Sequence, residues 1–198
     1  MVHNGATRIR LLGVGGSTRA GAASFVLVRA ALAMAAELGT ETREADVGVL
    51  DLPLLREGMP LASYPSALPW LLAEARAADA FLFCSPTYLG TVSGAMKNLL
   101  DLLSFLGSDD PPYLAGKPVA LLAVGGANAA HTITALWHAA HALDGVVTQT
   151  SAAVPAAAVD RANGVIVDPK IESRLRRLVG EVVDLAGRTR TGFGESAE

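Results

Sequence analysis

Several features that define other classes of protein are scarce or missing in this chain of 198 residues. It has one cysteine, Cys84, so an internal disulfide is excluded, and a single thiol suits a reducing compartment. Charged residues make up only 18%, the formal net charge is −3, and no basic block gives electrostatic support for nucleic-acid binding. No apolar run approaches the roughly 18 residues that a membrane span requires, and residues 1–10 lack the apolar core of a signal peptide. We therefore expect a cytoplasmic protein that binds neither nucleic acid nor membrane.

Apolar residues, in contrast, are abundant. They make up 51% of the chain, which is enough for a substantial hydrophobic core and argues against disorder. The length fits one domain of ordinary size, and we find no repeat or low-complexity segment that would divide it. The sequence predicts a single domain over residues 1–198, with a frayed tail at residues 188–198.

Strand-like and helix-like patterns alternate along the chain. Short apolar or alternating runs predict strands, in order, at residues 9–14, 40–47, 80–85, 118–124 and 146–154. Helical spacing predicts helices at residues 24–38, 68–75, 92–106 and 130–143, and a last helix that begins with Asp168 as N-cap and Pro169. Five strands that alternate with five helices predict the α/β class, as one doubly wound, flavodoxin-like parallel sheet with strand order 2-1-3-4-5 and helices on both faces.

The loop between the first strand and the first helix, residues 13–24, has an unusual composition. A strand–loop–helix turn aims backbone N–H groups and the positive end of a helix dipole at whatever lies above it. The loop adds a guanidinium, Arg19, and three hydroxyls, Ser17, Thr18 and Ser24. Many donors with one bidentate cation suit a terminal phosphate dianion. The loop therefore predicts a site for a mononucleotide monophosphate.

Other interpretations of this loop are weaker. A Walker A loop needs Lys and a hydroxyl after its last glycine, but Ala22 and Ala23 follow Gly21 here. A dinucleotide fingerprint needs a third glycine where this chain has Thr18. The remaining alternative is a Gly/Ser-rich loop that only turns the chain.

Two more loops are expected at the same edge of the sheet, where ligands of doubly wound folds bind. Residues 86–94 offer a proline-set turn, with Tyr88 and Leu89 to cover the face of a flat ring. Gly125 and Gly126 follow the fourth strand and allow close backbone approach to the polar edge of a heterocycle. The alternative is that Tyr88 packs over the sheet end and that the glycines make a plain turn.

Taken together, the motifs resemble the NADPH-dependent FMN reductase family. The resemblance extends from about Arg8 to Val154 and rests on the pairing of residues 16–24 with residues 85–101. The run 114–126 with His131 is most similar to the flavin reductases that serve two-component monooxygenases, such as the alkanesulfonate system. One departure is Val92, which stands where the alkanesulfonate-type reductases carry a tyrosine near the start of a helix.

The resemblance implies an NAD(P)H:flavin oxidoreductase with FMN and NADPH or NADH as cofactors, in which hydride passes from the nicotinamide to flavin N5. No nucleophile–base set is visible in the sequence, so the flavin would carry the chemistry. The residues implied to hold the flavin are Ser17, Arg19 and Ser24 at the phosphate, Pro86, Thr87, Tyr88, Leu89 and Gly90 along the isoalloxazine, and Gly125 and Gly126 at its pyrimidine edge. Two further cofactor-binding candidates are Thr18, as a hydroxyl of the first loop, and His131, which lies at the start of a predicted helix and can approach the flavin.

Two other functions are compatible with the same motifs. A quinone or azo-compound reductase with tightly bound FMN is one alternative, and a flavodoxin-like electron carrier is an alternative of another class. A monooxygenase that receives reduced FMN is a candidate partner.

Leu100 and Phe105 widen an apolar helical stripe, which favours a homodimer or homotetramer. We expect no metal site at His131, His138 and His141, because no carboxylate or second histidine lies at i+4 on that face.

Overall fold

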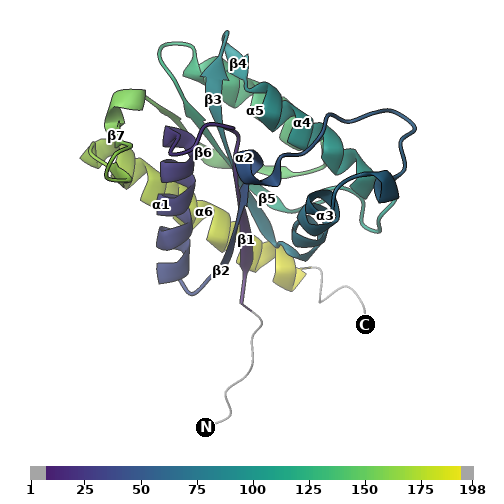
Figure 1. Ribbon diagram of the computed structural model, residues 1–198. Helices are drawn as coiled ribbons and strands as arrows, with labels where there is room; N and C mark the ends of the chain where they lie inside the picture. The colour runs from purple at the N-terminus through teal and green to yellow at the C-terminus, as the bar shows by residue number, and fades with distance from the viewer. Residues whose placement is uncertain (1–7, 193–198) are drawn as a thin grey trace.

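A central parallel sheet between two layers of helices organises the computed structural model, which describes residues 8–192 (Figure 1). Its strands and α-helices, in chain order, are β1 (Arg10–Gly15), α1 (Ala23–Glu37), β2 (Glu41–Asp46), α2 (Val47–Leu50), α3 (Ala67–Ala77), β3 (Ala80–Tyr88), β4 (Thr91–Val92), α4 (Gly94–Leu102), β5 (Pro118–Val124), α5 (Ala129–Ala142), β6 (Val146–Val154), β7 (Val159–Asp160), β8 (Val165–Ile166) and α6 (Pro169–Gly192). Short 3₁₀ turns lie at Leu61–Ser63, Leu103–Leu106 and Ala156–Ala158.

The sheet order is β2-β1-β3-β5-β6, and every neighbouring pair along that path is parallel. This is the 2-1-3-4-5 order predicted from the sequence, so the flavodoxin-like fold is confirmed. Helices α1 and α6 pack on one face, in a cluster with Leu11, Leu82 and Leu122. Helices α3, α4 and α5 pack on the other face, against Leu12 and Phe83 among others. Alternate residues of the strands thus feed two separate apolar cores.

Strand β3 does not stop at Pro86, as the sequence predicted, but continues to Tyr88. It turns back into β4, with Thr87 opposite Val92 and Tyr88 opposite Thr91. The two residues at the turn, Leu89 and Gly90, have φ values of 50° and 82°. Positive φ at both central positions suits the right-handed twist of a hairpin. The prediction that a helix begins at Val92 is therefore wrong, because α4 begins only at Gly94. Ser93 is its N-cap, and the Ser93 hydroxyl accepts a hydrogen bond from the N–H of Met96.

A second small hairpin, β7–β8, was not predicted at all. It pairs Val159 with Ile166 and Asp160 with Val165. Val159 is buried and Ile166 packs against the same core cluster, beside α1. These contacts fix the hairpin over the end of α1 that follows the first loop.

The last helix, α6, runs to Gly192, four residues beyond the expected end at Arg188; residues 193–198 of the expected tail lie outside the described residues. Its side chains reach the edge strand β6 where the pairing with β5 is irregular. The Glu181 carboxylate accepts hydrogen bonds from the N–H and hydroxyl of Thr150, at 2.8 and 2.6 Å, and Arg174 Nε donates to the carbonyl of Ser151 at 2.7 Å. Within residues 8–192, no helix is both long enough and apolar enough to span a membrane.

Candidate functional site

The loops predicted to meet at the carboxyl ends of β1, β3 and β5 do meet there, around a pocket of about 430 Å³. Its lining is Ser17, Arg19, Ala22, Ala23, Ser24, Pro86, Thr87, Tyr88, Val124, Gly125, Ala156, Val159 and Arg161. This is the position at which doubly wound sheets bind ligands. The first loop supplies polar groups, and the ends of β3 and β5 supply a more apolar wall.

The first loop has the features of an anion site. Ser17 and Ser24 are 2% and 1% exposed, and both line the pocket. The hydroxyl of Ser24 is buried and has no hydrogen-bond partner within the described chain. Helix α1 starts here, and no side chain of residues 8–192 caps its first turn. An orphaned hydroxyl beside uncapped N–H groups of a 15-residue helix indicates an acceptor-rich ligand.

Arg19 supplies the positive charge that such a ligand needs. Its side chain is exposed and forms no ion pair with any residue of the described chain. Its backbone N–H donates to the hydroxyl of Ser17 at 3.2 Å, which ties the loop to itself. The guanidinium is therefore available to an anion in the pocket.

Buried contacts hold the first loop against β3 and α4. The N–H of Gly16 donates to the carbonyl of Cys84 at 2.8 Å, and the Ser93 hydroxyl donates to the carbonyl of Gly16. The N–H of Ser93 in turn donates to the hydroxyl of Ser85 at 3.0 Å. Only glycine fits at position 16, because a Cβ there would lie 2.8 Å from the Cβ of Met96. The loop is thus positioned by β3 and by the start of α4 before any ligand arrives.

The ring side of the pocket is positioned by a pair of threonines. Thr132 of α5 is fully buried, and its hydroxyl donates to the hydroxyl of Thr87 at 2.9 Å. Gly125 lies so close to Thr87 that an added Cβ would be 2.7 Å from the Thr87 Cβ. Thr87 and Gly125 therefore form one fixed wall, with α5 behind it.

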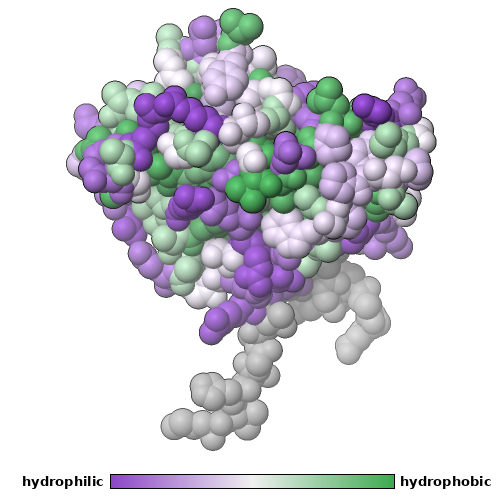
Figure 2. Space-filling view, viewed as in Figure 1, coloured by the Kyte–Doolittle hydropathy of each residue, from purple (hydrophilic) through white to green (hydrophobic). Residues whose placement is uncertain are grey.

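Tyr88 and Leu89 are more open than their predicted role of ring cover suggests. Tyr88 lines the pocket but is 54% exposed, and Leu89 is fully exposed at the hairpin tip. Figure 2 shows hydrophobic atoms at the top of the molecule, over the β3–β4 hairpin. One side of the pocket is accordingly bordered by an aromatic ring that solvent reaches.

Of the predicted residues, the pocket lining includes Ser17, Arg19, Ser24, Pro86, Thr87, Tyr88 and Gly125. It does not include Thr18, Leu89, Gly90, Gly126 or His131. His131 is exposed in the first turn of α5, and Gly126 precedes that helix. Arg161 and Ala156 also line the pocket, from segments after β6, and neither was predicted from the sequence. The local signal was the dipeptide Asn163-Gly164, which is typical of a hairpin turn but does not indicate which loop the hairpin faces.

The structure also places the single cysteine and the two remaining histidines of α5. Cys84 is fully buried in β3, and burial raises the pKa of its thiol well above the usual range. His138 and His141 are exposed on α5, where the His141 ring lies 3.9 Å from the ring of Trp137. In the part of the chain that the structure describes, no three His, Cys, Asp or Glu side chains gather as a metal site would need.

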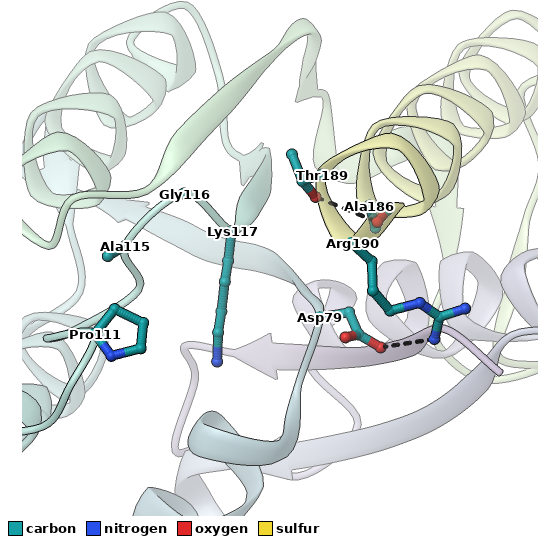
Figure 3. A pocket seen from close by; sticks show the side chains of 8 residues that line it. All are labelled: Asp79, Pro111, Ala115, Gly116, Lys117, Ala186, Thr189 and Arg190. Atoms are coloured by element: carbon teal, nitrogen blue, oxygen red, sulfur yellow. Dashed lines mark hydrogen bonds and ion pairs between the residues drawn. The ribbon is translucent and has the colours of Figure 1, made fainter. Parts of the chain in front are cut away.

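A larger pocket of about 500 Å³ lies near the amino ends of β3 and β5, away from the three loops (Figure 3). Its polar groups already have partners. Lys117 Nζ donates to the carbonyls of Ala75 and Arg76 at 3.1 and 2.9 Å, and burial lowers its pKa. Asp79 accepts from the N–H of Arg10 at 2.8 Å and pairs with Arg190 at 3.8 Å. This pocket therefore offers less for a polar ligand than the first one.

Comparison with known proteins identifies the family of the chain. Residues 9–159 match the family of NADPH-dependent FMN reductases. The chain belongs to this family. The match includes the loop between β1 and α1, the β3–β4 hairpin and the loop after β5.

Individual relatives agree with the family. The chain is 36% identical over 119 residues to a probable NADPH:quinone oxidoreductase from Oryza sativa subsp. japonica, an alignment that covers 60% of this chain and 57% of the rice protein. It is 32% identical over 114 residues to an NAD(P)H-dependent FMN reductase from Pseudomonas aeruginosa, with 58% of each chain covered. Both alignments thus span little more than half of each relative. The fold is similar to that of FerB, a flavoenzyme NAD(P)H:(acceptor) oxidoreductase from Paracoccus denitrificans, with a TM-score of 0.72, 22% identity and coverage of 92% of this chain and 98% of that one.

Proposed function

We propose that this protein is an NAD(P)H-dependent FMN reductase, with the flavin phosphate held by the loop between β1 and α1. The observation that carries this is the buried, unpartnered hydroxyl of Ser24 at the uncapped start of α1, beside Ser17 and Arg19. A phosphate oxygen satisfies such a hydroxyl, and the dianion matches the guanidinium and the helix dipole. The donor set therefore fits FMN.

Each part of the pocket has a role under this proposal. When bound, FMN supplies the hydride acceptor for a reduced nicotinamide. Ser17, Arg19 and Ser24 hold its phosphate, and Thr87 and Gly125 form the rigid wall against which the ring is oriented. The exposed Tyr88 leaves one side of the pocket open, so that a second flat molecule can enter. The proposed reaction accordingly needs no acid–base residue, only orientation by this chain.

A quinone is the second candidate acceptor. The rice relative is named as a probable NADPH:quinone oxidoreductase, and the open side beside Tyr88 is compatible with a flat aromatic acceptor as well as with nicotinamide. The two candidates differ in what leaves the protein. A flavin reductase releases reduced FMN, whereas a quinone reductase retains its flavin and releases the reduced acceptor.

The expected homodimer or homotetramer stays a prediction, and its original reason is wrong. Leu100 is only 5% exposed and Phe105 packs edge-on against Tyr64, with ring centroids 5.5 Å apart, so both side chains belong to the core of the chain itself. The partner monooxygenase also stays a prediction. Sedimentation of the purified protein tests the first, and trapping of reduced FMN by an added flavin-dependent monooxygenase tests the second.

The decisive experiment is steady-state oxidation of NADPH and of NADH by flavin-stripped protein, with and without added FMN. Turnover that requires FMN is the expected result, and Arg19→Ala should weaken FMN binding by about 1.5–3 kcal/mol if Arg19 makes a charge-assisted phosphate contact. Retention of FMN through many turnovers with reduction of an added quinone would favour the quinone reductase. Tight FMN binding without oxidation of either nucleotide would instead indicate an electron carrier.

A further inference from the structure

We propose that Arg161 is a second cation of the phosphate site and makes the pocket selective for phosphorylated flavin. This inference deepens the proposed function and rests on it. Arg161 lies in the turn of the β7–β8 hairpin, more than 130 residues from the phosphate loop in sequence, yet it lines the same pocket as Ser17, Arg19 and Ser24. None of the motifs that define the loop includes it.

The hairpin holds the backbone of Arg161 in place. Before the turn, Ala158 and Val159 are 5% and 6% exposed and belong to the core cluster beside α1. The N–H of Val167 donates to the carbonyl of Ala158 at 2.9 Å, which closes the base of the hairpin. A cation on this support reaches the pocket from a segment other than β3 and β5, which form the wall, and its backbone needs no ordering when a ligand binds.

The acidic residue next to Arg161 is engaged elsewhere. Asp160 accepts hydrogen bonds from the N–H groups of Ala162 and Asn163, at 3.0 and 3.2 Å, and from the side-chain amide of Asn163 at 2.7 Å. These bonds lower the pKa of the Asp160 carboxyl, since all of them favour its charged form. Within residues 8–192, Arg161 itself forms no ion pair. Its guanidinium is therefore not neutralised by its own turn.

The charge of the pocket matches a phosphate monoester. The lining contains two guanidinium groups, those of Arg19 and Arg161, and no carboxylate among the described residues. A phosphate monoester carries a charge of about −1.5 to −2 near neutral pH, so one arginine balances only part of it. Both arginines are exposed, and screening by solvent limits what each contributes. We expect the second cation to strengthen FMN binding by about 10-fold, and a 10-fold change in Kd corresponds to about 1.4 kcal/mol.

Quenching of flavin fluorescence tests this without turnover. FMN and riboflavin are titrated into the flavin-stripped wild type, Arg161→Ala, Arg161→Glu and Arg56→Ala, where Arg56 is an exposed arginine outside the pocket lining. We expect FMN affinity to fall about 10-fold in Arg161→Ala and further in Arg161→Glu, while riboflavin affinity stays unchanged in both. The Arg56→Ala control carries the same loss of charge and should bind FMN as the wild type does.

The outcomes separate the two proposals. If the wild type binds FMN no better than riboflavin, the phosphate loop and the proposed function fail together. If the wild type prefers FMN and Arg161→Ala keeps that preference, only the role of Arg161 is overturned. Equal losses of FMN and riboflavin affinity in Arg161→Ala would also overturn it, because they would show a contribution to the pocket that is independent of the phosphate.

Discussion

The Ser93 hydroxyl donates a hydrogen bond to the carbonyl of Gly16, a residue 77 positions earlier in the chain. The same hydroxyl accepts the N–H of Met96 at 3.1 Å and so caps α4. One side chain, 2% exposed, thus connects the start of a helix on one face of the sheet with the loop that leads to the helix on the other face.

We predict that Ser93→Ala destabilises the fold by about 2–4 kcal/mol, because α4 loses its N-cap and the buried carbonyl of Gly16 loses its donor. Urea unfolding of the flavin-free protein measures this. Ser104→Ala is the matched control, since Ser104 is exposed and its substitution should change stability by less than about 0.5 kcal/mol. Equal midpoints for the two variants would contradict the assignment.

Ser24→Ala should have opposite effects on the free and the flavin-bound protein. In the free protein, removal of a buried, unpartnered hydroxyl is expected to be neutral or to stabilise by about 1 kcal/mol. With FMN present, loss of a donor to a charged phosphate should weaken binding by about 1.5–3 kcal/mol. Thermal unfolding with and without FMN measures both. A lower melting temperature of the flavin-free variant would show that the hydroxyl has a structural partner.

Thr132→Val tests how the ring wall is positioned. Valine keeps the shape of threonine but removes the donor to Thr87, so we expect a loss of about 1 kcal/mol in stability and a changed visible spectrum of bound flavin. Thr132→Ser keeps the hydroxyl and should retain the wild-type spectrum. A spectrum that is unaltered in Thr132→Val would mean that Thr87 is held by packing against Gly125 alone.

The buried thiol of Cys84 predicts that the stability of the fold depends on pH in the alkaline range. Burial raises the pKa of Cys84 above the value of about 8.5 of a free thiol, so the folded state disfavours the thiolate. The contribution of the protonated thiol to the stability of the fold is complete below the pKa of the free thiol. It is lost as the pH rises above that pKa, because the unfolded state then releases the thiol proton while the folded state keeps it. We expect the stability to fall above about pH 9, and less steeply in Cys84→Ala. A thiol-reactive dye should label Cys84 at pH 8 only after unfolding; rapid labelling of the native protein would contradict the burial.

The sheet and its order could be predicted because strands alternate with helices along the chain and each strand is a short apolar or alternating run. Pro118–Val124 and Val146–Val154 were placed to the residue. The two hairpins were not predicted. Strands of two residues have no periodicity, and a leucine at positive φ in the β3–β4 turn contradicts local preference.

Only part of the candidate site was predicted from the sequence. Ser17, Arg19 and Ser24 were found because they lie within one loop of recognisable composition. Arg161 was missed because only tertiary structure brings its hairpin to that loop. The exposure of Tyr88 was missed because it follows from the turn of the hairpin rather than from the residue type.

The contacts of α6 with the edge strand have a consequence for encounters between molecules. An open strand edge invites pairing with a strand from another chain, and proteins commonly guard against this with bulges and charged side chains. Here the irregular centre of β6 is bonded by Glu181 and Arg174 of α6, and the same helix packs through Leu178 and Val182 into the core. A strand from another molecule could pair with the middle of β6 only if α6 were displaced from it. Protection against edge-to-edge aggregation is thus coupled to the stability of the whole domain.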